Sequence, residues 1–250
     1  MGKDKILLGA RLYVGGYDFS GQGIEPGTLQ DEMGRVPMYG WDQVTKWFIP
    51  SGRREVGIDG LQVHMDDTAD TGTMTSIAAK PSAESATFAI GQNGAAPAAA
   101  DPAYLVPPLQ DGAQLSWNEE RAVLSANFVM DSAKETANYD KPWGVVLLPL
   151  TALTASTNGT VVDLGAAGAD GAAANLHITV SGPGDFAFVI EDSPTGAFGG
   201  EETTLITFDS DGSAVGGEFD SVSGAVLQYV RVKVTRTSGT CSAMIALTVN

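Results

Sequence analysis

The residues of this chain that could do chemistry are few and scattered. There are two histidines, His64 and His177, and one cysteine, Cys241. A Ser-His-Asp or Cys-His centre needs a histidine beside an activated nucleophile, and the sequence has no strand-turn-helix elbow that would present one. Both histidines lie in predicted strands with apolar neighbours, so we expect structural roles for them. Cys241 lies at an alternating position of a C-terminal strand, where a small core residue is expected.

Acidic clusters suggest metal binding as the next possible chemistry. His64 is followed by aspartates between residues 66 and 70, but zinc sites need more histidine or cysteine ligands than this segment supplies. Residues 209–220 have part of the carboxylate spacing of a calcium loop. The sharp turn at the sixth position needs glycine, which is Ala214 here, and the twelfth position is Asp220 instead of glutamate. We therefore predict turns at both places and no metal.

Two pairs of carboxylates and one glycine-rich segment complete the search for a catalytic site. Glu191-Asp192 and Glu201-Glu202 are neighbours along the chain, whereas a glycosidase needs two carboxylates that face one cleft from separate elements. The glycines of residues 21–27 miss the dinucleotide-binding spacing, and the chain has no phosphate-binding loop. The sequence thus predicts no catalytic residue and no cofactor, and we expect that the protein is not an enzyme.

The distribution of charge narrows the possible partners. The chain carries 30 acidic and 14 basic residues, with a formal net charge of −16. Residues 142–230 contain eleven carboxylates and no lysine or arginine. Such a surface repels phosphate groups and anionic lipid, which disfavours functions that grip nucleic acid or a membrane. The apolar stretch near residue 6 is too short for a secretory signal, so we expect a cytoplasmic protein.

The hydrophobic pattern predicts a mainly β protein with two domains, residues 1–150 and 151–250. In the first domain the expected strands are 6–14, 17–20, 56–65, 86–90, 114–117, 122–130 and 143–148. In the second, short apolar segments alternate with turn residues, as in a β-sandwich. Its expected strands are 160–163, 175–180, 186–190, 204–208, 224–234 and 242–249. The low-bulk, uncharged segment 149–159 is the expected linker.

One long segment, about residues 21–57, fits neither strand pattern and is predicted to be an irregular loop. Loops of this length inside a compact domain are usually functional. One short helix is expected within it, because apolar residues between positions 41 and 48 have helical spacing. The loop also carries five residues of the types enriched at interface hot spots: Trp41, Trp47, Phe48, Arg53 and Arg54. The aromatic part of the loop either forms an assembly interface or packs on the loop's own core.

Several segments resemble the major tail proteins, or tail tube proteins, of long-tailed bacteriophages. Residues 6–21 resemble the opening strand, tight turn and second strand of that family, with Phe19 in place of the commoner leucine. Residues 142–147 and 159–165 resemble the junction between the family's two domains. Residues 227–232, followed by a glycine hairpin and a last strand, resemble its C-terminal sandwich.

The resemblance implies a structural protein of the virion tail, assembled in the host cytoplasm. In that family, hexameric rings stack into a hollow tube through which the genome is delivered. The subunit has an N-terminal tail-tube-like β-barrel or β-sandwich with one short helix, and a C-terminal immunoglobulin-like β-sandwich that decorates the outside. The implied partners are further copies of the chain and other tail proteins, while DNA passes through the lumen without specific binding. No membrane contact is implied.

Two other classes of protein fit the same residues. A capsid decoration or head-tail completion protein would share the acidic, β-rich and non-enzymatic character. A carbohydrate-binding sandwich would be monomeric and would need exposed aromatic residues, which are few in residues 151–250.

Overall fold

The computed structural model describes residues 9–20, 23–25, 27–38, 47–64, 85–107, 110–117, 122–129, 139 and 141–250. Nearly all regular structure in these ranges is β-strand, with a 3-10 turn at Gln92–Gly94 (η2). The prediction of a mainly β protein is therefore confirmed. Within the same ranges, no helix is both long enough and apolar enough to cross a membrane.

The strands form antiparallel pairs throughout the described residues. In chain order they are β1 (Ala10–Val14), β2 (Tyr17–Asp18), β3 (Gly23–Glu25), β4 (Thr28–Met38), β5 (Trp47–His64), β6 (Ala86–Ile90), β7 (Pro102–Val106), β8 (Gln110–Trp117), β9 (Ala122–Val129), β10 (Trp143–Leu153), β11 (Thr157–Asn158), β12 (Val162–Asp163), β13 (Ala172–Val180), β14 (Asp185–Ser193), β15 (Thr203–Thr207), β16 (Gly216–Val222), β17 (Tyr229–Ser238) and β18 (Cys241–Val249).

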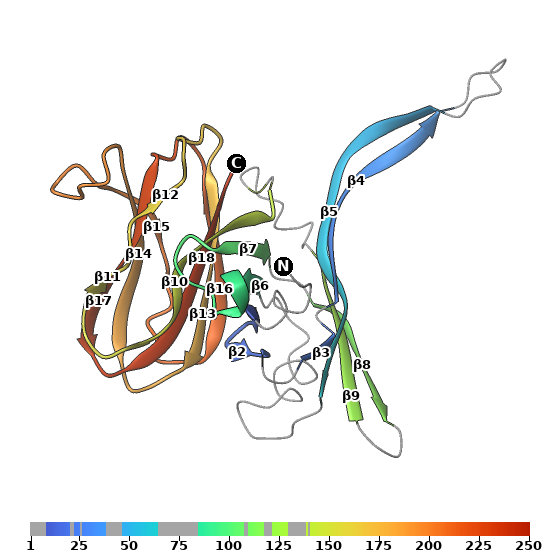
Figure 1. Ribbon diagram of the computed structural model, residues 1–250, viewed down its shortest axis with the longest axis horizontal. Coiled ribbons are helices and arrows are strands. Elements are labelled where there is room, and N and C mark those ends of the chain that lie inside the picture. Colours follow the sequence, from blue (N-terminus) through green and yellow to red (C-terminus); the bar gives the residue numbers. More distant parts are fainter. Residues whose placement is uncertain are drawn as a thin grey trace.

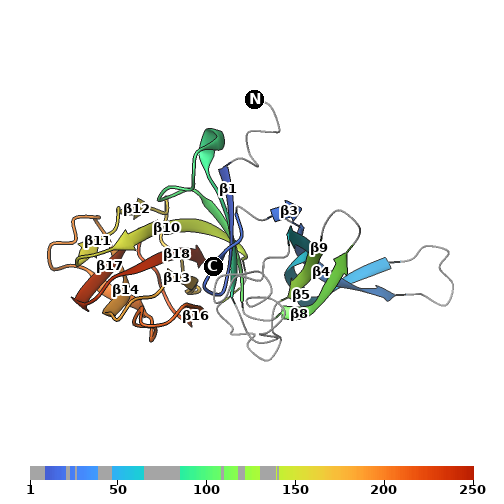
Figure 2. The ribbon, with the colours of Figure 1, turned by 90° about the horizontal axis from the view of Figure 1, so that it is seen from below.

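Three sheets stand side by side (Figures 1 and 2). The central sheet has eight strands in the order β16-β13-β18-β10-β7-β6-β1-β2. The outer sheet has the order β11-β17-β14-β15, with β12 also paired to β17. The arm sheet has the order β3-β5-β9-β8, with β4 also paired to β5. Figure 2 shows the outer sheet on one side of the central strands and the arm sheet on the other.

The central sheet is buried on both faces, because its alternating side chains enter two different hydrophobic cores. Val146 of β10 and Ala246 of β18 belong to the first core, which includes Phe128 of the arm sheet. Their neighbours Leu147 and Leu247 belong to the second core, shared with the outer sheet. Successive residues of a strand point to opposite faces, so β10 and β18 separate the two cores and contribute side chains to both.

The predicted C-terminal sandwich corresponds to the central and outer sheets packed on the second core. Its inner side chains include Ile245 of β18 facing Phe188 of β14 and Val232 of β17, all fully buried. An immunoglobulin-like topology for this part stays a prediction. The predicted boundary between residues 150 and 151 falls inside β10, which pairs with β7 near its start and with β18 along most of its length. The division into two domains likewise stays a prediction.

The predicted barrel is wrong for the described residues, since none of the three sheets closes. The central sheet curls until the β1–β2 turn reaches β13 and β16, but these elements meet by close packing and not by a strand ladder. A Cβ added to Gly16 would lie 2.3 Å from the backbone nitrogen of Gly216. Only residues without a side chain allow such an approach.

The predicted irregular loop at residues 21–57 is also wrong where the structure describes it. Residues 28–38 form β4 and residues 47–57 form part of β5, paired from Thr28↔Asp59 to Met38↔Trp47. The expected helix is contradicted at its end, because Trp47 and Phe48 begin a strand; residues 41–46 lie outside the described ranges. Glycine, aspartate and proline have low strand propensity, but backbone pairing between neighbours decides the structure here.

Candidate assembly interface

Strands β4 and β5 form a long hairpin, which we call the arm, extending away from the body (Figure 1). At Gly57 and Ile58, β5 pairs with β4 on one edge and with β9 on the other. Strands β4 and β8 therefore lie on opposite sides of the arm sheet. Within the described residues, no strand pairs with the outer edge of either one. Open edges present rows of unpaired N–H and C=O groups, which favour pairing with another chain.

The predicted interface residues fall on the arm, apart from Trp41, which lies outside the described residues. Trp47 pairs with Met38, and Phe48 pairs with Pro37, at the distal end of the described hairpin. Arg54 pairs with Met33 nearer the body, and Arg53 lies where the register shifts. The backbone thus places these four residues on one projecting element. Their role in an interface stays a prediction.

The root of the arm is held by Tyr104 of β7 in the central sheet. Its buried hydroxyl donates a hydrogen bond to the carbonyl of Gln30 in β4 and lies 3.4 Å from the carbonyl of Gly57 in β5. Gln30 and Gly57 are cross-strand partners, so one side chain contacts both strands of the hairpin. A buried tyrosine hydroxyl normally requires such a partner.

Apolar packing holds the same root. Ile58 of β5 and Phe128 of β9 are fully buried in the first core. The side-chain oxygen of Asn127 accepts a hydrogen bond of 2.9 Å from the amide of Gly60. The arm therefore leaves the body from a fixed base, and its direction is set by contacts with the central sheet.

A buried histidine joins distant strands across the curled central sheet. We call the contact of His177 with Gly15 and Thr87 the seam. The His177 ring of β13 lies with Nδ1 2.6 Å from the carbonyl of Gly15 and Nε2 2.8 Å from the hydroxyl of Thr87. A carbonyl can only accept, so Nδ1 carries the proton and the Thr87 hydroxyl donates to Nε2. Asn175 donates to the same hydroxyl at 2.9 Å. The predicted structural role of His177 is confirmed.

Burial lowers the pKa of His177 to about 4, against a smaller opposing effect of the hydrogen bond to Gly15. The ring stacks against Tyr13 at 5.8 Å between centroids, and burial also raises the pKa of Tyr13. Both groups are thus neutral at pH 7. His64, by contrast, is an exposed residue at the end of β5.

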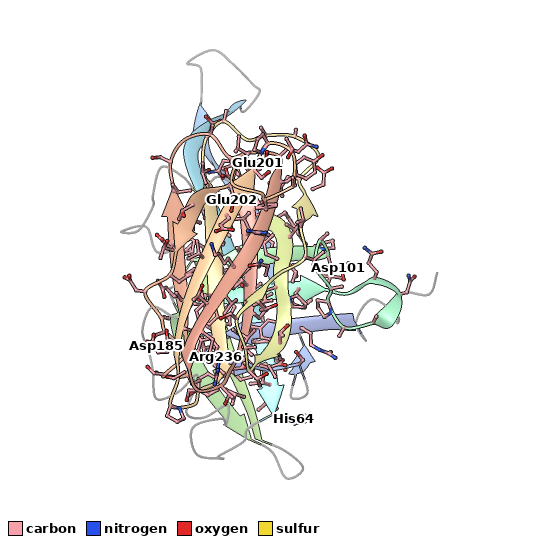
Figure 3. All side chains as sticks on the ribbon, turned by 90° about the vertical axis from the view of Figure 1, so that its left-hand side faces the viewer. His64, Asp101, Asp185, Glu201, Glu202 and Arg236 are labelled. Carbon is pink, nitrogen blue, oxygen red and sulfur yellow. The ribbon has the colours of Figure 1, made fainter. Side chains whose placement is uncertain are left out.

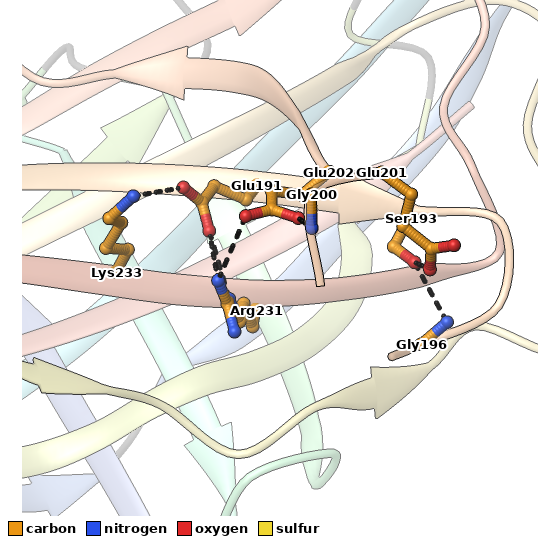
Figure 4. Close-up of polar contacts among 8 residues, drawn as sticks. All are labelled: Glu191, Ser193, Gly196, Gly200, Glu201, Glu202, Arg231 and Lys233. Carbon is orange, nitrogen blue, oxygen red and sulfur yellow. Dashed lines mark hydrogen bonds and ion pairs between the residues drawn. The ribbon is translucent and has the colours of Figure 1, made fainter. Parts of the chain in front are cut away.

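Two basic residues of β17, Arg231 and Lys233, are bound by acidic partners (Figure 4). The Glu191 carboxylate of β14 lies 2.7 Å from Nη2 of Arg231 and 2.8 Å from Nζ of Lys233, both on β17. Arg231 also lies over the Phe198 ring at 4.2 Å and 3.9 Å from Glu202. Burial raises the pKa of Glu191, but Lys233 and Arg231 outweigh it and lower the pKa overall. These contacts stabilise the outer sheet.

The other residues considered for catalysis or metal binding are Cys241, the paired carboxylates and the aspartates after His64. Cys241 is buried, and burial raises the pKa of its thiol to about 11, which makes it unreactive. The Glu201 carboxylate accepts hydrogen bonds from Ser193 and Thr195. Figure 3 shows Glu201 and Glu202 at the opposite end of the sandwich from Asp185. The aspartates at residues 66–70 lie outside the described ranges, and the described residues hold no group of potential metal ligands.

Comparison with known proteins gives only remote likenesses. No protein-family model matches the chain, and no curated relative matches it. Among solved structures, it is similar to the Dit protein (gp 19.1) of phage SPP1, described as a paradigm of the hub adsorption apparatus in phages that infect Gram-positive bacteria. The match has 14% identity and covers 95% of this chain and 98% of that one, with a TM-score of 0.28.

A second likeness is to the structure of infectious bursal disease virus, Gx strain. It has 11% identity and covers 97% of this chain and 68% of that one, with a TM-score of 0.23. Both TM-scores are too low for either structure to decide the fold or the function of this chain.

Proposed function

We propose that this chain is a structural subunit of a phage tail, of the tail tube type, that assembles with copies of itself into stacked rings. The observation that carries the proposal is the arm sheet, which is open along β4 on one side and along β8 on the other in the described residues. The resemblance of residues 6–21, 142–147 and 159–165 to major tail proteins supports the same function.

Pairing of β4 in one copy with β8 in the next would extend the arm sheet from subunit to subunit. The two edges are different surfaces, so the contact is head-to-tail, and such contacts form a ring when the rotation closes. Strand addition of this kind gains main-chain hydrogen bonds and removes the open edges. The resemblance implies six subunits in each ring.

The arm supplies a second contact in this proposal. It projects beyond the body from a fixed root, and it carries Trp47, Phe48, Arg53 and Arg54 along its strands. Tryptophan and arginine are enriched among residues that dominate binding energy. In a stacked assembly we expect these residues to contact a neighbouring copy. The net charge of −16 would let DNA pass through a lumen without adhering.

Electron microscopy of the purified protein tests the proposal against its alternatives. We expect rings or tubes of uniform bore, with sedimentation that depends on concentration. A capsid decoration or head-tail completion protein would instead bind empty capsids or connectors and form no tubes of its own. Monomers at every concentration, with no ring in any image, would contradict the proposal.

A further inference from the structure

A groove lies at the junction of β10, β18 and the loop after β12. It has a volume of about 290 Å³, and its lining includes Lys141, Trp143, Leu164, Ala167, Leu247 and Asn250. This size is near the lower end of small-ligand sites, which start at about 300 Å³. The groove is lined by both apolar and polar residues, and ligand sites combine the two kinds.

Trp143 is the exposed aromatic residue of this groove. The residue is 46% exposed and begins β10, a strand whose residues 146–148 are buried. The ring packs edge-to-face on Tyr104, its cross-strand partner, at 5.1 Å between centroids. The Thr248 hydroxyl lies 2.7 Å from the carbonyl of Lys141 and 3.0 Å from the carbonyl of Trp143. The indole is therefore held in place before any ligand arrives, which lowers the entropic cost of binding.

The opposite wall is a loop of small residues with exposed peptide groups. Gly168 is fixed by a two-way backbone bridge with Val226. Ala166 and Ala167 before it are exposed, and their peptide groups make no hydrogen bond to other described residues. At the rim, Lys141 is exposed and forms no ion pair within the described part of the chain. These groups are donors and acceptors available to a ligand.

We propose that this groove binds a sugar ring of an uncharged carbohydrate. A pyranose has an apolar C–H face, which would stack on the Trp143 indole, and a rim of hydroxyl groups. The hydroxyls would bond to the Lys141 ammonium and to the peptide groups of Ala166 and Ala167. The ligand is uncharged because a protein with a net charge of −16 repels anionic glycans. No described residue of β4 or β8 lines the groove. Because Trp143 packs on Tyr104, whose hydroxyl bonds to Gln30 of β4, sugar binding and ring assembly are measured separately.

The test is titration of the whole chain with cellotetraose and with the tetramer of N-acetylglucosamine at millimolar concentration, followed by saturation-transfer NMR. We expect signal transfer from the protein to the sugar C–H protons with at least one of these probes. Trp143→Ala should weaken that binding at least about tenfold, the loss expected for a hot-spot aromatic. Leu150→Ala is the matched control, because Leu150 is an exposed apolar residue of the same strand outside the groove.

A second variant keeps the experiment decisive if Trp143→Ala disturbs the fold. Ala167→Phe leaves the tryptophan in place and fills the groove from an exposed position, so it should abolish binding with an unchanged melting temperature. Failure of both probes to bind the native chain, or equal binding by the Trp143→Ala variant, would overturn the proposal. Loss of rings in Trp143→Ala without any sugar binding would assign the groove to a protein contact instead. Normal rings with no sugar binding would leave the tail function standing and reject the carbohydrate site alone.

Discussion

The central sheet and the arm sheet are built on different principles. In β13 the residues from Ala172 to Ile178 are all buried, so side-chain packing on two faces fixes the strand. In the arm, β4 and the distal half of β5 pair only with each other among the described residues. The faces of the central sheet are therefore covered by the two cores, whereas β4 of the arm leaves a long backbone edge for a partner. We infer that the first region serves stability; in the proposed assembly the second region binds a neighbouring copy.

Removing part of the central sheet should have the largest effect on stability. It would also test the proposed domain boundary between residues 150 and 151. A fragment that begins at residue 151 lacks most of β10, including the pairs Val145↔Leu247 and Val146↔Ala246 and the buried Leu147. We expect a fragment of residues 143–250 to unfold cooperatively at a distinctly higher temperature than one of residues 151–250. Calorimetry of the two fragments gives the answer; equal melting temperatures would mean that β10 is dispensable to the sandwich.

A single substitution in the hydrophobic core should have the next largest effect on stability. Phe188→Ala empties a fully buried position in the second core, and we expect it to lower the free energy of unfolding by about 3–5 kcal/mol. Phe128→Ala makes the matched change in the first core. Urea titration at pH 7 measures both. Separate transitions in the Phe128 variant would show that the two cores unfold independently.

Acid should weaken the seam. The pKa of His177 is about 4 in the folded protein, below its unfolded value of about 6.5. Between these values the unfolded chain binds more protons, so stability is complete above about pH 6.5 and falls as the pH drops towards 4, by about 3 kcal/mol in total. His177→Gln removes this titration, and urea midpoints between pH 7 and pH 4.5 should fall less steeply in that variant. Parallel slopes would rule out His177 as the cause.

Substitutions on the arm should affect assembly and not stability. We expect Trp47→Ala or Phe48→Ala to weaken each subunit contact by about 2 kcal/mol or more. Rings and tubes should then become short or absent while the melting temperature changes little. Electron microscopy and calorimetry on the same sample measure the two effects, with Leu150→Ala as an exposed control outside the arm. A lowered melting temperature with normal tubes would instead place these aromatic residues in the subunit's own core.

The smallest effect is expected in the outer sheet. Glu191→Gln removes the partner of Arg231 and Lys233, and we expect a loss of about 1 kcal/mol that shrinks at high salt. Because the folded pKa of Glu191 is lowered, its contribution is present above the unfolded pKa and is lost as the pH falls through the folded one. Glu202→Gln, 3.9 Å from Arg231, should cost less. Equal losses at pH 7 would show that the short contacts carry no extra energy.

The C-terminal strands could be predicted from the sequence because their apolar residues are packed in the core. The expected strands 175–180, 186–190 and 242–249 lie within β13, β14 and β18 or match them closely. Strand β16 was missed, since its sequence is rich in glycine and acidic residues and its structure comes from pairing with β13. The arm was missed for the same reason, because no alternation of side chains marks a strand that is fixed by its backbone partner.

The sites were harder to predict because they join distant parts of the chain. His177 meets Gly15 and Thr87 across 162 and 90 residues, and no local pattern marks such a contact. The groove beside Trp143 combines residues near positions 141–145, 164–168 and 247–250. The apolar pattern predicts a strand at Trp143, but the exposure of this residue depends on how β7 and β18 pack around it.

Hydrogen exchange of the assembled and dissociated protein tests the central claim most directly. If β4 of one copy pairs with β8 of the next, the amides of residues 28–38 and 110–117 should gain protection together on assembly. Strand β15, which lies at the end of the outer sheet's strand order, is the control and should exchange equally in both states. Protection confined to the control strand, or assembled particles in which β4 and β8 exchange as fast as in monomers, would contradict the account.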